Sequence, residues 1–207
     1  MEFVMRLLRT LLIAGLFSVF VAHADENPAD TVNNLHEALL QNMKQGKKSP
    51  CATRISAMQK TVASTFDMPF LSKFVIRKHW GDLSSTQQQD FTAALTLMTS
   101  STYASEFTNF GGEQFVNGKT EDLGKDKKVV HSKLLIPSED TVTFDYMLKQ
   151  TDGHWRIINV IANGVSDIAI RSAQYDRVIK DKGFDSLLAQ IQSQNEKMGK
   201  ECHAEKK

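Results

Sequence analysis

The first half of the chain carries hydrophobic residues at helical spacing. Between residues 28 and 48 the apolar positions recur every three or four residues, which predicts an amphipathic helix. These positions are Val32, Leu35, Leu39 and Met43. The pattern resumes at Ile55 and predicts a second helix that reaches Phe66. A short third helix follows, with Pro69 near its first turn and Gly81 at its end.

The longest helical pattern runs from residue 85 to residue 110. Ser85 and Gln88 have the spacing of a capping box at its start. Gly111 and Gly112 predict where it ends. The apolar stripe of this helix consists of Phe91, Leu95, Met98, Thr102, Tyr103, Phe107 and Phe110.

Alternation of polar and apolar residues replaces the helical pattern after residue 112. We expect strands at 113–117, 127–137, 141–150 and 154–161. An Asp-Gly turn joins the last two into a hairpin. In the first strand of that hairpin one face carries Val142, Phe144, Tyr146 and Leu148. Because no helical pattern separates these strands, the sheet is predicted to be antiparallel.

A second helical region closes the chain. Apolar residues repeat from Val165 to Ile179, Gly183 stops this helix, and Phe184 begins another. The last ten or so residues are polar and are predicted to be flexible. The whole pattern predicts one α+β domain, in which N-terminal and C-terminal helices pack on a curved antiparallel sheet and enclose an apolar pocket.

The N-terminus has the pattern of a cleaved signal peptide. Arg6 and Arg9 precede an apolar run at 11–21, and small residues end the segment at Ala24. The run is shorter than the ~20 residues that a membrane span needs. We therefore expect residues 1–24 to be removed and residues 25–207 to form the exported domain. An uncleaved N-terminal anchor is the alternative.

The charge balance of the chain argues against one class of function, the binding of nucleic acid. Without the leader the chain has 23 basic and 23 acidic residues, so it lacks the electrostatic signature of a nucleic-acid-binding protein.

The cysteines of the chain, Cys51 and Cys202, lie near the two ends of the exported domain. A disulfide across about 150 residues would stabilise the fold by roughly 4–5 kcal/mol in the chain-entropy model. The sequence leaves open whether the two sulfurs meet.

No motif in the sequence points to catalysis or to a metal. The histidines after the leader, none of which has metal-ligand spacing, are His36, His79, His131, His154 and His203. Asp145 and Glu113 are the carboxylates that a cone-shaped α+β enzyme pocket would use, but Asp145 alternates with aromatic residues as on the polar face of a strand. We expect no enzyme activity, no cofactor and no metal.

Apolar side chains are the remaining feature of the sequence that suggests a function. Aromatic residues gather on the faces of the helices and of the hairpin, and most of them are expected to form the core. Helices precede and follow the strands along the chain. If both groups pack on a curved sheet, a cavity can form between the layers. An apolar cavity without a catalytic group suggests transport of an apolar ligand.

Two stretches of the chain, 77–115 and 154–191, resemble the MlaC family of periplasmic phospholipid-binding proteins, also called toluene-tolerance proteins. The resemblance covers about residues 30–191. The matching residues are Arg77, Trp80, Leu83, Ser84, Gln88, Thr102, Tyr103, Ala104, Phe110, Gly112, Glu113, Trp155, Arg156, Ile157, Val160, Gly164, Val165 and Ser166.

The resemblance implies a periplasmic lipid carrier that holds acyl tails in an apolar pocket. It would move phospholipid between an outer-membrane lipoprotein/porin complex and an inner-membrane ABC transporter with an MCE-domain protein, and so serve outer-membrane lipid asymmetry. Arg77 and Arg171 are candidate cations at the rim, for the headgroup. The candidate pocket residues are Phe70, Phe74, Trp80, Phe91, Leu95, Met98, Tyr103, Phe107, Phe144, Tyr146, Trp155, Ile157, Val165, Ile168 and Tyr175.

The chain departs from the family pattern after Gly164-Val165-Ser166. Asp167 enters early, Arg171 stands where the family usually has a tyrosine, and Tyr175 replaces a phenylalanine. These differences resemble the hopanoid-associated, HpnM-like branch, so a hopanoid is the alternative cargo. Two other classes also stay open: an enzyme with a cone-like pocket, and a ligand-free periplasmic adaptor whose aromatic faces are core or interface.

Overall fold

The sheet lies between two groups of helices in chain order. The computed structural model describes residues 26–204, with side chains up to Gly199; the signal-peptide prediction for residues 1–24 lies outside the described residues. The helices are α1 (Pro28–Gln45), α2 (Cys51–Thr65), α3 (Met68–Ile76), α4 (Ser85–Glu106), α5 (Asp167–Lys182) and α6 (Phe184–Ala204), with 3₁₀ segments η1 (Gly46–Lys48) and η2 (Arg77–Asp82). The strands are β1 (Gln114–Gly124), β2 (Lys127–Leu135), β3 (Val142–Thr151), β4 (His154–Ala162) and β5 (Val165–Ser166).

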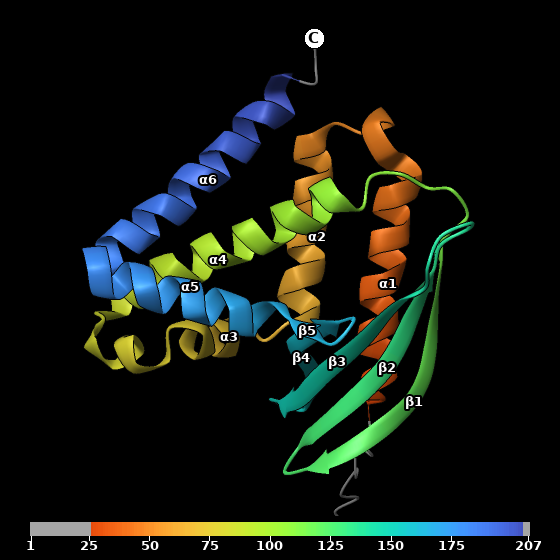
Figure 1. The fold of residues 1–207 in the computed structure, drawn as a ribbon, viewed down its shortest axis with the longest axis horizontal. Helices are drawn as coiled ribbons and strands as arrows, with labels where there is room; N and C mark the ends of the chain where they lie inside the picture. Colours follow the sequence, from red (N-terminus) through yellow and green to blue (C-terminus); the bar gives the residue numbers. More distant parts are fainter. Residues whose placement is uncertain (1–25, 205–207) are drawn as a thin grey trace, which may run out of the picture.

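The five strands form one sheet in the order of the chain, and every neighbouring pair is antiparallel. This confirms the predicted α+β class and the β3–β4 hairpin. Register shifts interrupt the β1–β2 pair twice and the β3–β4 pair once. Such bulges bend and twist a sheet, and the strands in Figure 1 curve past α1. The helices lie against one face of this curved sheet.

The covered face of the sheet carries the residues that the alternation predicts. Tyr146 is 2% exposed and Leu148 is fully buried, whereas Thr143 on the other face is exposed. The predicted helical stripe of α1 is buried as well, because Leu35 and Leu39 face the sheet side of the core. Alternation and helical spacing therefore predicted the core layers correctly.

The capping box of helix α4 lies one residue before the predicted one, and the helix ends earlier than the sequence predicts. Its N-cap is Ser84, whose hydroxyl accepts from the Gln87 amide at 3.2 Å while the Gln87 side chain accepts from the Ser84 amide at 3.0 Å. The capping box is thus one residue upstream of the predicted Ser85–Gln88 pair. The helix ends at Glu106 because the Asn42 side chain donates to the carbonyls of Ala104 and Phe107, so the glycine pair at 111–112 lies in the following loop.

Three further boundaries differ from the predictions. Helix α3 ends at Ile76, before Gly81, because Arg77 takes a positive φ of 32° and starts the 3₁₀ segment. Strand β1 is longer than 113–117, since an edge strand with mostly exposed residues on both faces lacks a clear alternation. Val165 belongs to β5, and α5 starts only after Ser166, whose hydroxyl accepts from the Ala169 amide.

The end of the chain is more regular than expected. Helix α6 continues to Ala204 and so includes most of the segment predicted to be flexible. Cys51, the first residue of α2, is disulfide-bonded. The chain has one other cysteine, Cys202, and its pairing with Cys51 stays a prediction, since side chains are described only up to Gly199. Within residues 26–204 no helix has the length and apolar character to cross a membrane.

Candidate ligand-binding pocket

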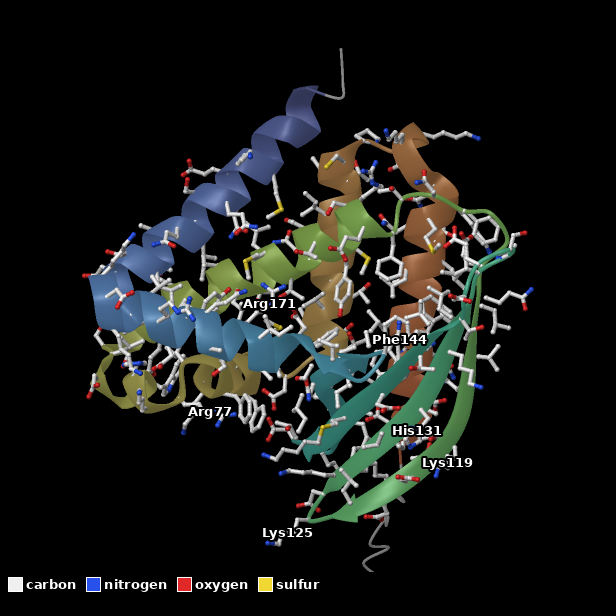
Figure 2. All side chains as sticks on the ribbon, in the orientation of Figure 1. Arg77, Lys119, Lys125, His131, Phe144 and Arg171 are labelled. Atoms are coloured by element: carbon white, nitrogen blue, oxygen red, sulfur yellow. The ribbon has the colours of Figure 1, made fainter. Side chains whose placement is uncertain are left out.

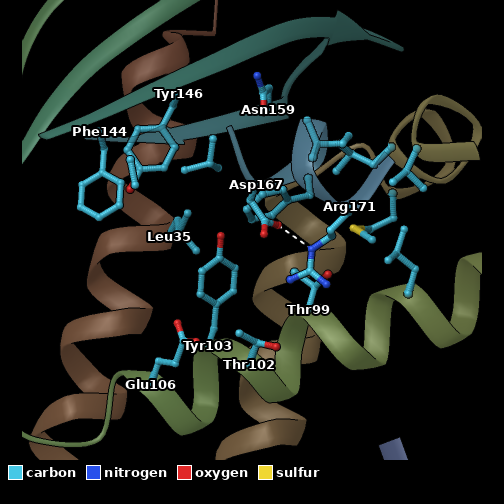
Figure 3. Close-up of a pocket in the computed structure, with 18 of the residues that line it drawn as sticks. Leu35, Thr99, Thr102, Tyr103, Glu106, Phe144, Tyr146, Asn159, Asp167 and Arg171 are labelled. Atoms are coloured by element: carbon cyan, nitrogen blue, oxygen red, sulfur yellow. Dashed lines mark hydrogen bonds and ion pairs between the residues drawn. The ribbon is translucent and has the colours of Figure 1, made fainter. Parts of the chain in front are cut away.

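A pocket of about 390 Å³ lies between the covered face of the sheet and helices α1, α3, α4 and α5. Figure 3 shows its walls, with Tyr146 and Phe144 on the sheet side and Tyr103 on α4 opposite them. Its lining residues are Leu35 and Leu39 from α1, Phe66 from the end of α2, and Met68, Leu71 and Val75 from α3. Helix α4 and its end contribute Leu95, Thr99, Thr102, Tyr103, Glu106 and Phe107. The sheet contributes Phe144, Tyr146, Asn159, Val160 and Ala162, and the β5–α5 corner contributes Val165, Asp167, Ile168 and Arg171.

The register of the β3–β4 hairpin builds the sheet wall. Phe144 pairs with Ala162 and Tyr146 pairs with Val160, and paired residues of an antiparallel sheet share a face. The rings of Phe144 and Tyr146 stack with centroids 5.8 Å apart. Ala162, the small partner of Phe144, lines the pocket beside it.

A buried polar contact holds the Tyr146 ring in this wall. The imidazole Nε2 of His36 on α1 lies 3.0 Å from the Tyr146 phenolic oxygen. The His36 ring also stacks on Phe115 with centroids 4.0 Å apart. Burial lowers the pKa of His36 from 6.5 to about 4, and burial raises the pKa of Tyr146. Both side chains are therefore neutral near pH 7. The Tyr146 phenol has a hydrogen-bond partner, and the pair adds no charge to the core.

The opposite wall is centred on Tyr103. Its ring packs against Phe66 and Phe107, with centroids 6.0 Å and 6.1 Å away. Burial, and secondarily the charge of Asp167, raises the pKa of the Tyr103 phenol far above its usual value. The phenol thus remains neutral at physiological pH, and this wall presents an uncharged aromatic surface to the pocket.

The charged residues that line the pocket are Glu106, Asp167 and Arg171. Nε of Arg171 donates to Oδ2 of Asp167 at 2.6 Å, one helical turn away on α5. The side chain of Arg171 is 23% exposed and that of Asp167 is 66% exposed. Glu106 and Val165 are the other exposed lining residues. The exposed residues mark the opening, so the pocket combines an apolar interior with a polar mouth.

Part of the residue set predicted from the sequence lines this pocket, namely Leu95, Tyr103, Phe107, Phe144, Tyr146, Val165 and Ile168. Arg171 also lines the pocket, and its role as a rim cation stays a prediction. Arg77 does not line the pocket; its guanidinium stacks on the Phe74 ring, 4.2 Å from the centroid.

The other predicted pocket residues lie elsewhere in the protein. Five of them are buried in the core without lining the pocket: Phe91, Met98, Trp155, Ile157 and Tyr175. Phe91, for example, is covered by Phe184 of α6, with ring centroids 5.7 Å apart. Phe70, Phe74 and Trp80 are half-buried outside the pocket, since α3 faces the cavity with Leu71 and Val75 instead.

Sequence reasoning missed two kinds of lining residue. Leu35, Leu39, Leu71 and Val75 are ordinary members of helical stripes, and nothing in the pattern separates a pocket wall from a filled core. The second kind is polar or small, and no search for apolar faces selects it: Thr99, Glu106, Asn159, Ala162 and Asp167. Thr102 belongs to the predicted stripe of α4 but was not predicted to line the pocket.

The carboxylates considered for an enzyme lie outside the pocket. Asp145 pairs with His131 on the outer sheet face, where its Oδ1 accepts from the imidazole Nδ1 at 2.7 Å. Glu113 accepts from the Gly111 amide in an exposed loop. No group of three or more His, Cys, Asp or Glu side chains among the described residues could hold a metal ion.

The fold and the pocket define a class of protein: an α+β domain that holds an apolar pocket between its helices and one face of a curved antiparallel sheet. A model of the MlaC protein family matches residues 33–193, and the chain therefore belongs to the MlaC family. The structure is also similar to that of the phospholipid-binding protein from Ralstonia solanacearum in complex with a phospholipid. The two have a TM-score of 0.74 and 16% sequence identity, over 84% of this chain and 99% of that chain.

Proposed function

We propose that the protein is a periplasmic phospholipid carrier that holds acyl tails in the pocket between α4 and the β3–β4 hairpin. The observation that carries the proposal is the composition of this pocket, with neutral aromatic and aliphatic walls and charge only at the mouth. Membership of the MlaC family and the likeness to a phospholipid-binding protein support it. Binding and release of a lipid require no bond to be made or broken, so the protein is proposed to be no enzyme.

Burial of the tails supplies the affinity. Each CH₂ group removed from water contributes about 0.8 kcal/mol, so a tail of ~15 methylenes contributes on the order of 12 kcal/mol before the cost of ordering it. This gain is independent of the headgroup. The polar end of the lipid would lie at the mouth, near Asp167 and Arg171, where water reaches both side chains.

A carrier of this kind would move lipid through the aqueous space between two membranes. The signal-peptide pattern of residues 1–24 supports export to the periplasm. There the protein would exchange lipid with an outer-membrane lipoprotein/porin complex and with an inner-membrane ABC transporter that carries an MCE-domain protein. A pocket that shelters the tails makes such a step possible, because each exposed methylene would otherwise cost ~0.8 kcal/mol in water.

The experiment is to purify the protein from periplasm without detergent, extract it with organic solvent, and identify the extract by mass spectrometry. Stoichiometric phospholipid is the expected result. A hopanoid, in a host that makes them, would replace the phospholipid in the proposal. An empty extract from folded protein, together with no uptake from labelled liposomes, would contradict the carrier function and favour the ligand-free adaptor.

A further inference from the structure

Helix α3 has a second apolar face that the pocket does not use. Met68, Leu71 and Val75 face the pocket, whereas Phe70 and Phe74 are half-buried on the outer side. Figure 2 shows Arg77 at the lower edge of the helical layer, away from the pocket residues Phe144 and Arg171.

Four side chains form a continuous row on this outer side. The Arg77 guanidinium lies 4.2 Å from the centroid of the Phe74 ring, and Phe74 stacks on Phe70 with centroids 5.9 Å apart and planes within 19°. Nζ of Lys149, from β3, lies 5.6 Å from the centroid of Phe70. We call these residues, Arg77, Phe74, Phe70 and Lys149, the α3 strip. It places a cation at each end of an aromatic pair.

The cations of the α3 strip are free to act on a partner. Among the described residues neither Arg77 nor Lys149 forms an ion pair, whereas neighbouring Lys78 pairs with Asp176 at 3.1 Å. The nearby carboxylate of Asp67 is engaged at the start of α3, where it accepts from the Phe70 amide and the Thr151 hydroxyl. Exposed Lys73 adds a third positive charge on the same side of α3.

The backbone at Arg77 is strained, which indicates that its position is held by its surroundings. Its φ of 32° and ψ of −97° lie outside the regions that non-glycine residues favour. Such strain concentrates at functional positions. Here it turns the chain at the end of α3 so that the guanidinium lies over Phe74 and not in solvent beyond the helix.

We propose that the α3 strip docks the protein on an anionic membrane surface. Cations at both ends match lipid phosphates, and partly exposed aromatic rings between them suit the boundary between headgroups and acyl chains. The same helix forms a wall of the pocket with Leu71 and Val75. Docking through α3 therefore brings the pocket close to the lipid layer, and the proposal does not depend on which lipid the pocket carries.

The test measures co-sedimentation of the full mature protein with vesicles of equimolar phosphatidylglycerol and phosphatidylcholine. Each basic residue near an anionic surface contributes about fivefold to the partition coefficient, so Arg77→Gln with Lys149→Gln is expected to lower it roughly 25-fold. Arg77→Lys keeps the charge and is expected to retain most of the binding. Salt that shortens the Debye length to about 3 Å is expected to release the wild-type protein.

A matched control exists at the far end of α1. Lys44 lies over the Phe110 ring, 5.1 Å from its centroid, and makes the same kind of contact away from α3. Lys44→Gln is expected to leave co-sedimentation unchanged. Ala162→Trp, which fills the pocket, is expected to leave it unchanged too, so that docking and cargo binding are tested separately. Absence of wild-type binding at low salt, equal binding to pure phosphatidylcholine, or equal losses in Lys44→Gln and the double variant would overturn the proposal.

Discussion

His36 on α1 and Tyr146 on β3 meet inside the protein, with 3.0 Å between the imidazole Nε2 and the phenolic oxygen. His36 is 4% exposed and Tyr146 is 2% exposed, so each side chain provides the hydrogen-bond partner that water would provide at the surface. The contact joins the first helix to the sheet wall of the pocket, because Tyr146 lines the cavity.

Removing one partner of this pair is expected to cost more than removing both. Tyr146→Phe leaves a buried imidazole nitrogen without a partner, and such an orphaned group costs about 1–3 kcal/mol. His36→Leu leaves the phenol in the same condition. Urea unfolding of both single variants and of the double variant measures the coupling. Additive losses would show that the contact contributes nothing beyond the volumes of the two side chains.

The stability of the protein is expected to fall in mild acid because of His36. Burial lowers its pKa from 6.5 to about 4 in the folded state. Between these values the unfolded chain binds a proton that the folded protein excludes, so the free energy of unfolding decreases as pH falls from 6.5 to 4. The loss from this group approaches about 3 kcal/mol, since each tenfold change in proton concentration contributes about 1.4 kcal/mol.

The matched variant for this acid effect is His36→Gln, which can still hydrogen-bond Tyr146 but does not titrate. Urea unfolding at neutral pH and near the lower end of the window is compared for both proteins. The variant is expected to lose less stability than the wild type over this interval. Equal losses would assign the acid sensitivity to other groups, such as the carboxylates.

The tyrosines are expected to resist ionisation while the protein is folded. The chain contains three tyrosines, Tyr103, Tyr146 and Tyr175, and burial is the main cause that raises the pKa of each. In the unfolded chain their pKa is about 10. Absorbance of tyrosinate is therefore expected to appear in urea at this pH but not in buffer. Ionisation in buffer below the pH of alkaline unfolding would contradict the buried walls described above.

How far the sequence predicts this protein is clearest in the β3–β4 hairpin and in α4. Period-two alternation places Phe144 and Tyr146 on one face, because only that face is covered by helices. The stripe of α4 likewise predicts that Phe91 and Leu95 face inward. It cannot tell that Leu95 lines a cavity while Phe91 is covered by Phe184, since α6 reaches that place only through tertiary packing.

The polar residues that line the pocket cannot be identified from hydrophobic spacing. Thr102 lines the pocket because it lies one turn from Thr99 on the side of α4 that faces the cavity, and its hydroxyl donates to the Met98 carbonyl. The stripe predicted for α4 includes Thr102, but helical spacing does not show which members of a stripe face a cavity. Arg171 was found because it departs from the family pattern, which is a signal of sequence comparison and not of hydrophobicity.

The ion pair at the mouth is expected to influence which headgroup is carried. Asp167 holds the Arg171 guanidinium at 2.6 Å and neutralises it. Asp167→Asn frees this positive charge, so the extracted lipid is expected to shift toward anionic headgroups such as phosphatidylglycerol. Asp181→Asn, on the same helix and exposed, is the control and is expected to cause no shift. Identical lipid profiles for wild type and Asp167→Asn would place the headgroup away from this pair.

The central claim is that lipid tails occupy the cavity beside Ala162, and one comparison tests it most directly. Ala162 lines the cavity next to Phe144, whereas Ile161 pairs with Asp145 on the opposite face of the same strand. The lipid content per protein chain is measured after detergent-free purification of Ala162→Trp and Ile161→Trp, with circular dichroism as the check of folding. We expect folded Ala162→Trp to be empty and Ile161→Trp to carry the wild-type amount. Folded Ala162→Trp with a full complement of lipid would contradict the central claim.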